Sequence, residues 1–272
     1  MSKNKNFSVV ITTYNRNLKL LNSIKSVLNQ KYKAKEIIVI NNYPKKITKK
    51  ELGFKKLKIL KIFNLKKNLQ AAGGRNFGAT KISYEYIAFL DDDDEWDRNY
   101  LNHANKIIKK DKSDVVLTNL YFINSKNKLL KKVENLNIQD CFIKNPGCMG
   151  SNLIINKKNF FEVNGFNKKY VPAEDRELLI RMLKKKFKFS ISNSRVYYDP
   201  SSENSISKNY DLILTGHSNL LNNYRSYINF ENIMFMNFKL SKIKFFKEKN
   251  LLFKIIRLAI TLTYFITHQI LK

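Results

Sequence analysis

The sequence predicts an α/β fold with a mainly parallel sheet and helices on both of its faces. Short apolar runs bounded by polar residues alternate with segments whose apolar residues recur at helical spacing, and this alternation is typical of a parallel sheet. The 272 residues, 43% of them hydrophobic, can bury a full core without disulfides or a structural metal. We therefore expect a large α/β domain, with room in the chain for an appendage.

The N-terminal quarter of the chain predicts three strands and one helix. A high β-branched content indicates a strand over residues 7–12, and apolar residues recur at helical spacing from residue 17 to about residue 31. A second buried strand over residues 36–40 ends at the turn-forming residues 41–44. After a basic connection, residues 57–63 predict a third strand.

The chain is organised around a buried strand over residues 86–90 that runs into four consecutive aspartates, Asp91 to Asp94. Ligands of open α/β sheets bind beyond the carboxyl ends of the strands, which is where these aspartates lie. Adjacent carboxylates repel one another unless a cation or protons neutralise them. The stretch therefore predicts a site for Mg²⁺ or Mn²⁺, which prefer oxygen ligands. The alternative is a solvated acidic turn.

A glycine-rich segment precedes this strand. Gly73 and Gly74 would let the backbone approach a ligand closely, and Arg75 is expected in the first turn of the helix that follows. A helix N-terminus combined with an arginine forms a plausible anion site. Taken alone, the glycine pair is as typical of a plain turn.

Strand-like segments dominate the part after the aspartates. A helix is expected from about residue 98 to residue 110, and residues 114–142 then have a strand-like pattern without a comparable helix. A flexible turn over residues 146–151 leads to a short strand over residues 152–155 and a brief helix over residues 157–163. Residues 187–191 and 195–198 are expected to form the two strands that close the sheet.

A second group of acidic residues lies at the start of a predicted helix. Pro172 ends the preceding structure, and the apolar residues from Leu178 to Leu183 give one helical face. Glu174 and Asp175 therefore lie in the first turn. Acidic residues are common there as caps and as partners of the helix dipole, which is the structural alternative to a catalytic role.

The net charge favours an anionic partner. The chain has 51 Lys and Arg against 22 Asp and Glu, a net charge of +29, which suits nucleic acid, an anionic membrane face or phosphorylated substrates. A lysine-rich composition without functional meaning is the alternative. No helix-turn-helix, zinc-finger or aromatic–basic sheet motif is present, so we expect no nucleic-acid partner. A non-catalytic nucleic-acid-binding protein remains the chief rival hypothesis, and a gel-shift titration would test it. A second rival is a metal-dependent phosphotransferase with an aspartate nucleophile, although the sequence has no matching Thr or Ser motif and Lys downstream.

The cysteines and the N-terminal residues indicate a cytoplasmic protein. Cys141 and Cys148 are too few and too closely spaced for a disulfide framework or a zinc site, which fits a reducing compartment. Residues 1–6 are polar and basic and lead directly into a strand, without the apolar region of an export signal.

Six motifs together resemble the family-two glycosyltransferases of the GT-A fold. Their order and spacing match that family across roughly residues 7 to 198. The motifs are Ser8-Val-Val-Ile-Thr-Thr-Tyr-Asn-Arg16, Ser26-Val-Leu-Asn-Gln30, Glu36-Ile-Ile-Val-Ile40, Gly74-Arg-Asn-Phe-Gly78, Phe89-Leu-Asp-Asp-Asp-Asp-Glu-Trp96 and Glu174-Asp-Arg-Glu-Leu-Leu-Ile-Arg181.

This resemblance implies an inverting transfer of a sugar from a nucleoside diphosphate sugar, most simply a UDP-sugar, to a hydroxyl of a glycan or glycolipid. It implies Asp175, assisted by Glu174, as the catalytic base. It places Asp93 and Asp94 at the metal. The residues that it assigns to the nucleotide sugar are Thr12, Tyr14, Arg16, Asn41, Arg75, Asp91 and Asp93.

The chain departs from the family pattern at two places. The second strand of family members usually ends in an aspartate that contacts the base, whereas Asn41 and Asn42 stand here. Many members also place a histidine near the metal, after the helix that bears the base. Here that region reads Tyr197-Tyr-Asp-Pro200, so the identity of the nucleotide and the full ligand set stay open.

Beyond Pro200 the pattern predicts a helical extension, so we divide the chain into a catalytic domain over residues 1–200 and a C-terminal part over residues 201–272. Residues 201–207 form a polar loop, residues 211–235 one helix and residues 251–271 a further, largely apolar helix. In that last helix a polar stripe lies opposite a broad apolar face. Its members are Lys254, Arg257, Thr261, Tyr264 and His268.

The uncharged part of this last helix is shorter than the ~20 residues that a membrane span needs. With five lysines over residues 239–249, it fits a helix that lies in the interface of an anionic membrane. We therefore expect peripheral contact with the inner face of the cell membrane. The alternative is a helix packed against the catalytic domain or a partner chain. The oligomeric state is left open.

Overall fold

The computed structural model describes residues 4–133, 136–200 and 209–270. Their strands form one sheet of nine, in the order β3-β2-β1-β4-β8-β6-β9-β5, with β7 paired to β6. The strands are β1 (Phe7–Thr13), β2 (Glu36–Asn41), β3 (Leu60–Asn64), β4 (Tyr86–Asp91), β5 (Glu95–Trp96), β6 (Val115–Phe122), β7 (Ser125–Lys131), β8 (Leu153–Asn156) and β9 (Phe189–Tyr198).

The long ladders of this sheet are parallel. Strand β1 pairs in parallel with both β2 and β4, β3 continues beside β2, and β9 runs parallel to β6. The antiparallel pairs are β4 with β8, β5 with β9, β6 with β7 and β6 with β8. Strands β6 and β7 follow one another with only residues 123–124 between them, which is too short for the crossover that a parallel pair needs. The predicted α/β fold with a mainly parallel sheet is thus confirmed.

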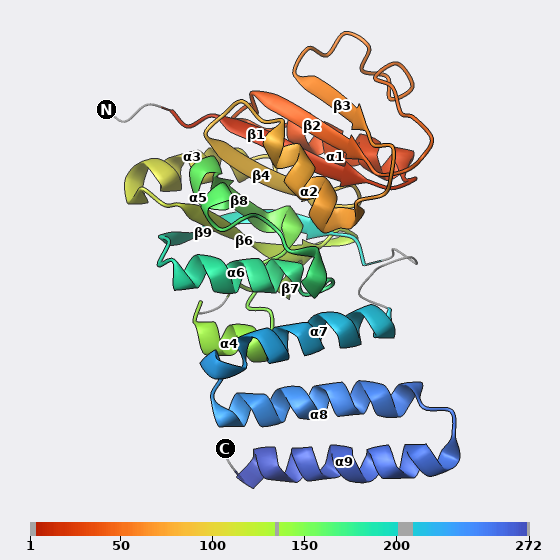
Figure 1. Cartoon of the computed structure of the whole chain (residues 1–272). Coiled ribbons are helices and arrows are strands. Elements are labelled where there is room, and N and C mark those ends of the chain that lie inside the picture. Colours follow the sequence, from red (N-terminus) through yellow and green to blue (C-terminus); the bar gives the residue numbers. More distant parts are fainter. Residues whose placement is uncertain (1–3, 134–135, 201–208, 271–272) are drawn as a thin grey trace.

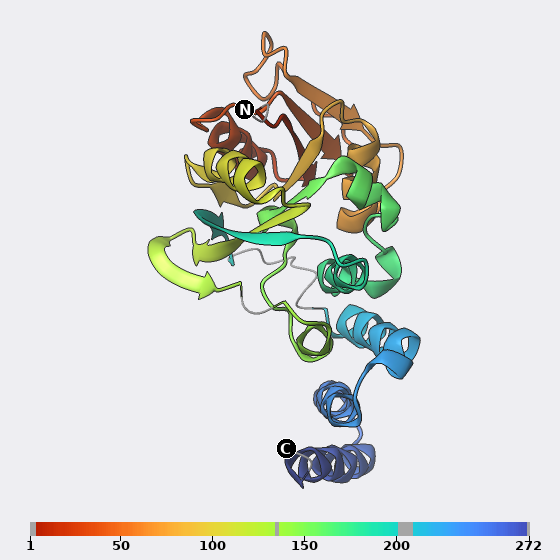
Figure 2. The ribbon, with the colours of Figure 1, turned by 90° about the vertical axis from the view of Figure 1, so that its left-hand side faces the viewer.

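Helices cover both faces of the sheet (Figures 1 and 2). Successive residues of β1 alternate between two buried clusters, because side chains of a strand point to opposite faces in turn. Helices α1 (Asn17–Leu28) and α3 (Tyr100–Asp111) contribute to one cluster, and α2 (Gln70–Thr80) and α6 (Glu174–Lys184) to the other. Both faces of the sheet are therefore covered by helices, so a ligand can reach the sheet only at its edges.

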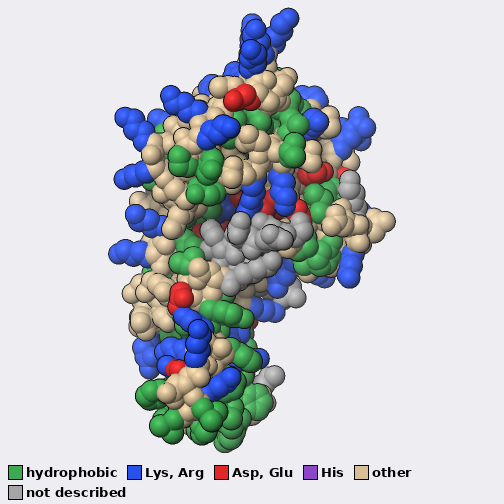
Figure 3. Space-filling view, turned by 90° about the vertical axis from the view of Figure 1, so that its right-hand side faces the viewer, with side chains coloured by type: hydrophobic (Ala, Val, Ile, Leu, Met, Phe, Trp, Pro, Cys, Tyr) green, Lys and Arg blue, Asp and Glu red, His purple; other side chains and the backbone are tan. Residues whose placement is uncertain are grey.

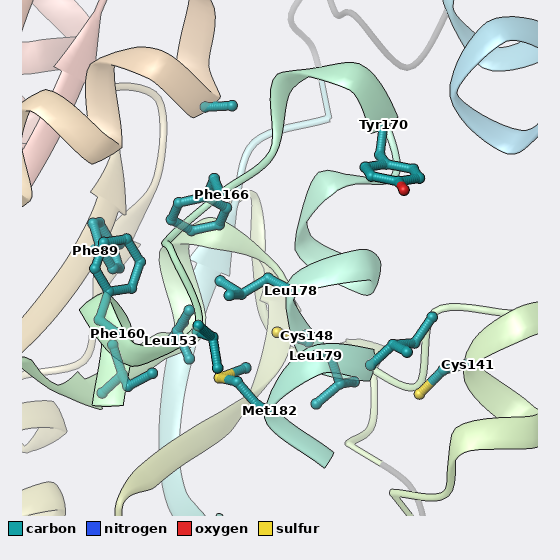
Figure 4. Packing of buried hydrophobic residues seen from close by; sticks show 14 of the residues in the cluster. Phe89, Cys141, Cys148, Leu153, Phe160, Phe166, Tyr170, Leu178, Leu179 and Met182 are labelled. Carbon is teal, nitrogen blue, oxygen red and sulfur yellow. The ribbon is translucent and has the colours of Figure 1, made fainter. Parts of the chain in front are cut away.

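The larger cluster packs α6 and the short helix α5 (Lys157–Glu162) against the sheet (Figure 4). The rings of Phe89, Phe160 and Phe166 lie with their centroids 5.2–5.7 Å apart. Leu178 and Met182 of α6 belong to the same cluster. The start of α6 is thereby fixed relative to the end of β4.

Three sequence-based expectations need correction. Helix α2 begins at Gln70, so Gly73 and Gly74 lie inside the helix and Arg75 lies beyond its first turn. The reason for glycine is close packing: a Cβ on Gly74 would lie 2.7 Å from Asn42 Nδ2. The two closing strands are one strand, β9.

The third correction concerns the C-terminal part, where the expected helix over residues 211–235 is two helices, α7 (Tyr210–Tyr224) and α8 (Phe230–Lys247). Asn229 separates them: its backbone is extended and its side chain accepts a hydrogen bond from the Asn232 N–H, as an N-cap does. The polar loop expected over residues 201–207 lies outside the described residues, and the domain boundary expected at residue 200 stays a prediction. Figures 1 and 2 show α7, α8 and α9 (Leu251–Ile270) as successive layers below the sheet.

The last helix presents its apolar face to solvent. The predicted polar stripe packs on α8: Thr261 is buried and hydrogen-bonds Ser241 at 2.7 Å, and the ring of His268 lies 4.9 Å from that of Phe235. On the other side, Phe253 and Leu252 are 54% and 64% exposed. By length and composition α9 is the one helix among the described residues that could cross a membrane.

Candidate active site

The site lies where β1, β2 and β4 end next to one another. In the register of the sheet, Thr12 pairs with Asp91 and Thr13 with Asn41. The sequence-predicted residues of three separate segments therefore meet at the carboxyl edge of the sheet, where ligands of α/β folds bind. On the face in Figure 3, acidic side chains appear in this region next to basic ones, just above the residues drawn in grey.

The four aspartates do not share one environment. The Asp92 carboxylate accepts hydrogen bonds from the Thr13 hydroxyl at 2.6 Å and from the Arg16 guanidinium at 3.1 Å. It is 4% exposed, and burial raises its pKa to about 6. Asp92 thus fixes the loop that follows β1, a role that the sequence did not reveal.

The other three aspartates act on one another electrostatically. Asp91 bonds the Arg75 guanidinium at 2.6 Å and Asp93 bonds Arg16 at 2.6 Å. Asp94 is 1% exposed and accepts a hydrogen bond from the Asp199 N–H at 3.1 Å. Burial, followed by repulsion from Asp91 and Asp93, holds the pKa of Asp94 well above its usual range. The three carboxylates therefore surround one region of concentrated negative charge.

Arg75 connects this region to the start of α6. Its guanidinium is buried, and Nη1 lies 3.6 Å from Glu174 Oε1 and 3.7 Å from Asp175 Oδ1, in addition to the bond with Asp91. Three carboxylates from β4 and α6 thus share one cation. The two acidic groups that the sequence singled out, some 80 positions apart in the chain, are brought together by Arg75.

Several polar atoms at this junction are buried and have no hydrogen-bond partner in the part of the chain that the structure describes. They are Arg75 Nε and Nη1, Glu174 Oε2 and Asp175 Oδ1. Buried polar groups in folded proteins are nearly always paired, and unpaired ones gather at functional sites. The geometry therefore favours a place for a polar ligand between α2 and α6, rather than the capping role considered for the two acidic residues.

Asp175 has the electrostatics of a proton acceptor. Burial is the largest effect on its pKa and raises it to about 7, although Arg75 acts in the opposite direction. Its Oδ2 accepts a hydrogen bond from the Gly150 N–H at 3.2 Å, which leaves Oδ1 unpaired. A carboxylate with a pKa near neutrality can take up and release a proton at physiological pH.

Arg75 is held in place by residues that the sequence did not single out. A Cβ on Gly150 would lie 2.4 Å from Arg75 Nη2, so only glycine leaves room for the guanidinium. The Phe166 ring lies 5.2 Å from Arg75 Cζ. Asn76 fixes that ring, because its side-chain amide donates to the Phe166 carbonyl at 2.7 Å and accepts from the Phe166 N–H at 2.8 Å. In the sequence, the one indication of these contacts is the pair Arg75-Asn76 within the motif of residues 74–78.

The remaining predicted residues lie around the same edge. Thr12 is buried next to Gly74, whereas Tyr14 is 50% exposed, with its ring 5.1 Å from that of Tyr43. The side chain of Asn41 donates to the Lys45 carbonyl and to Asn64, and accepts from the Tyr43 N–H. Asn41 thus shapes the loop after β2, and a contact with a base would have to replace these bonds.

The donor set at the aspartates suits a hard divalent ion. Asp91, Asp93 and Asp94 supply only oxygen ligands, and Mg²⁺ is commonly held by one or two carboxylates together with waters and substrate phosphates. Across the described parts of the chain, no three His, Cys, Asp or Glu side chains form a complete metal-ligand set. A substrate would have to provide the remaining ligands.

Solved structures of glycosyltransferases share this fold. Staphylococcus aureus TarS 1–349 in complex with UDP-GlcNAc aligns with a TM-score of 0.59 at 16% sequence identity, over 96% of this chain and 71% of that one. GalNAc-T7 with UDP, GalNAc and Mn²⁺ aligns with a TM-score of 0.66 at 17% identity, over 86% of this chain and 52% of that one. The GT-A fold expected from the motifs is confirmed.

Three relatives are glycosyltransferases by name. An uncharacterized glycosyltransferase of Rickettsia bellii is 35% identical over 58% of this chain, which spans only 24% of that protein. The amylovoran biosynthesis glycosyltransferase AmsB of Erwinia amylovora is 27% identical, over 69% of this chain and 67% of that one. The UDP-Glc:α-D-GlcNAc-diphosphoundecaprenol β-1,3-glucosyltransferase WfgD of Escherichia coli is 29% identical, over 65% and 69%.

The match to a protein family covers the strand ends and the four aspartates of the site but ends before Glu174 and Asp175. The model of the family described as Glycosyl transferase family 2 matches residues 8–168, which is more than half of the chain and includes β1, α2 and the four aspartates. This protein belongs to glycosyl transferase family 2.

Proposed function

We propose that this protein is an inverting glycosyltransferase that moves a sugar from a UDP-sugar to a hydroxyl of a growing glycan or glycolipid. The observation that carries the proposal is Oδ1 of Asp175, which is buried without a hydrogen-bond partner among the described residues and lies 3.7 Å from Arg75 Nη1, beside the carboxyl ends of β1 and β4. A buried carboxylate next to a cation, at the edge where α/β folds bind ligands, supports a role for Asp175 as proton acceptor.

The donor would lie across the ends of β1 and β4. Arg16 and Arg75 are the cations there, and each is at present paired with an aspartate. Thr12, Tyr14 and Asn41 are the residues proposed beside the nucleoside. Bound UDP-GlcNAc in TarS and UDP in GalNAc-T7 support a uridine nucleotide.

Asp93 and Asp94 are proposed as the metal ligands, and Asp91 adds to the negative charge at this site. A bound Mg²⁺ or Mn²⁺ would neutralise the charge that grows on the departing diphosphate. The Mn²⁺ in the GalNAc-T7 structure supports a divalent ion. Asp92 is excluded from this group because both of its oxygens bond the loop after β1.

Asp175 is proposed as the general base. Its Oδ1 would accept the proton of the acceptor hydroxyl while that oxygen forms a bond to the anomeric carbon and the bond from this carbon to the diphosphate breaks. Attack on the face opposite the diphosphate inverts the configuration. Arg75 keeps Asp175 partly ionised, since its charge opposes the effect of burial on the pKa, and Glu174 shares the same cation.

The substitution Asp175→Asn tests this assignment. Purified variants would be incubated with UDP-glucose, UDP-galactose and UDP-GlcNAc, Mn²⁺ and candidate acceptors, and released UDP and the anomeric configuration of the product would be measured. We expect Asp175→Asn to bind UDP as the wild type does but to lose transfer by a factor of about 100 or more. The matched control is Glu162→Gln, which removes a surface carboxylate that pairs with Lys185. Near-normal transfer by Asp175→Asn, or a retained configuration, would refute the assignment.

We further propose that the enzyme works at an anionic membrane surface on the cytoplasmic side. The exposed apolar face of α9 and the lysines at the end of α8 support this location. The diphosphoundecaprenol acceptor in the name of WfgD supports a lipid-linked acceptor.

A further inference from the structure

A group of basic side chains lies where α6 meets the C-terminal helices. Arg176 follows Asp175 directly, but its charge acts on Cys141 of α4 (Ile138–Ile143) and not on the carboxylates of the active site. His217 of α7 and Lys239 of α8 lie close enough to Arg176 for its charge to lower the pKa of each. The packing of the helices agrees with this proximity, because Lys239 donates to the Ile143 carbonyl at the end of α4 and α4 itself packs against α6.

The guanidinium of Arg176 is buried and has no counter-charge among the residues that the structure describes. The residue is 6% exposed, and its Nε and Nη2 atoms are buried without a hydrogen-bond partner. Within the described parts of the chain, no carboxylate forms an ion pair with it, and Cys141 is the one group that favours its charged form. Burial of an unpaired charge is strongly unfavourable, so the arrangement is incomplete as it stands.

The neighbours of Arg176 add positive charge instead of balancing it. The Lys239 ammonium donates to the Ile143 carbonyl and lies 4.5 Å from the centre of the Phe235 ring. Burial and Arg176 lower the pKa of Lys239 to about 8 and that of His217 to about 4. At neutral pH the cluster therefore holds two positive charges and one neutral imidazole.

We propose that Arg176, His217 and Lys239 form a binding site for a phosphate group, carried either by a lipid headgroup or by a soluble phosphate compound. The guanidinium fork matches the oxygens of a phosphate. A phosphate monoester carries nearly two negative charges above its second pKa of about 6, which balances Arg176 and Lys239. A single carboxylate would leave one charge uncompensated.

This site is separate from the proposed sugar transfer. It shares no residue with the aspartates, Arg75 or Asp175, so it can be correct even if the proposed reaction is wrong. Because α7 and α8 also lead to the exposed apolar face of α9, a lipid is one of the two sources to be tested.

Melting temperatures of the full chain in rising concentrations of inorganic phosphate test the proposal. A ligand of the folded state raises the melting temperature. We expect the wild type to gain roughly 5 °C when free phosphate is at about 100 times its Kd, and Arg176→Met and Lys239→Met to gain little at the same concentration. The matched control is Lys244→Met, which removes an exposed lysine of the same helix and should respond as the wild type does. An equal gain in wild type and Arg176→Met would place the phosphate elsewhere and overturn the proposal.

A second comparison separates an anion site from a structural arginine. Without phosphate, Arg176→Met should melt at or above the temperature of the wild type, because an unpaired buried charge is replaced by an apolar side chain of similar length. At high phosphate concentration the wild type should have the higher melting temperature of the two. If Arg176→Met melts below the wild type by the same amount at every phosphate concentration, Arg176 has a structural role only.

The source of the phosphate is decided by a short-chain lipid. Dihexanoyl phosphatidic acid carries the same phosphomonoester on a soluble lipid. The site takes a lipid headgroup if this lipid gives the same rise in melting temperature as inorganic phosphate at a concentration at least about tenfold lower, and if the rise depends on Arg176. If the lipid and inorganic phosphate are needed at equal concentrations, the site takes soluble phosphate compounds. We count a difference of about tenfold or more as a contribution of the acyl chains.

Discussion

Arg75 Nη1 lies 3.7 Å from Asp175 Oδ1, and the same guanidinium bonds Asp91 at 2.6 Å. One buried cation therefore faces both the strand end that carries the proposed metal ligands and the helix that carries the proposed base. Arg75 lowers the pKa of Asp175, against the effect of burial. A change at Asp91 that alters its bond with Arg75 therefore also alters the pKa of Asp175. The charge of Arg75 is thus central to the pH dependence of the site.

Transfer should require the ionised form of Asp175. Because burial raises the pKa of Asp175 to about 7, kcat/KM should rise with pH and level off above that value. Arg75→Met removes the cation that lowers this pKa, so its midpoint should move upward by about 1–3 pH units. Rates of UDP release between pH 5 and pH 9 check both values. A flat profile in the wild type would contradict Asp175 as the base.

The same pKa predicts an effect on stability with a definite sign. The folded-state pKa of Asp175 lies above its unfolded value, so its contribution to stability is lost as pH rises through about 7. Asp175→Asn should therefore be more stable than the wild type at pH 8, and similar to it near pH 4. Melting temperatures at the two pH values test this, independently of any substrate.

Gly150→Ala should displace Arg75 without touching a charged group. The new Cβ would lie 2.4 Å from Arg75 Nη2, so the guanidinium must move away from Asp91 and Asp175. We expect the free energy of unfolding to fall by about 1–3 kcal/mol and transfer to fall at least tenfold. Circular dichroism melting and the UDP-release assay give the two numbers. Full activity in a folded Gly150→Ala variant would show that the position of Arg75 is unimportant.

Much of the fold and the main acidic groups could be predicted from the sequence because the signals are local. The apolar runs of β1, β2 and β4 identify buried strands, and the aspartates directly after β4 must then lie at the carboxyl edge of the sheet. Asp175 was found in the same way, through the helix that follows it. The start of α2 was misplaced because glycines inside a helix resemble a turn when their packing partner is unknown.

The contacts between distant segments could not be predicted. The clash that requires glycine at position 150 involves Arg75, and Asn76 bonds residue Phe166 across the sheet edge. Neither relation leaves a pattern in the local sequence. The different environments of the four aspartates likewise depend on bonds with Thr13 and Arg16, which lie some 80 residues earlier in the chain.

Asp93→Asn tests the proposed metal site while Asp92 still bonds Thr13 and Arg16. Removing one of three mutually repelling carboxylates weakens cation binding but relieves repulsion at Asp94, so the variant should fold well. We expect its affinity for UDP in Mn²⁺ to fall at least about tenfold, and the dependence of that affinity on Mn²⁺ to be reduced. Calorimetric titrations of UDP with Mn²⁺ and with EDTA provide the comparison. The proposed metal site would be wrong if wild type and variant bind UDP equally well in both buffers.

The last helix should bind anionic membranes through its exposed face. Phe253, Ile256 and Ile260 are 45–54% exposed, and each apolar side chain of this size contributes about 1.5 kcal/mol or more when it leaves water. Replacing all three by serine should lower binding to phosphatidylglycerol vesicles at least a hundredfold. Because these side chains face solvent, the melting temperature should stay close to that of the wild type.

Co-sedimentation with the vesicles measures this binding, and two comparisons make the result specific. Leu18→Ser removes an apolar side chain that is 82% exposed on α1 and should leave binding unchanged. Binding of the wild type should weaken as salt rises, because the lysines near the end of α8 attract the anionic surface and salt screens this attraction. Equal pelleting of the wild type and the triple variant would exclude α9 as the contact and favour a partner chain on its apolar face.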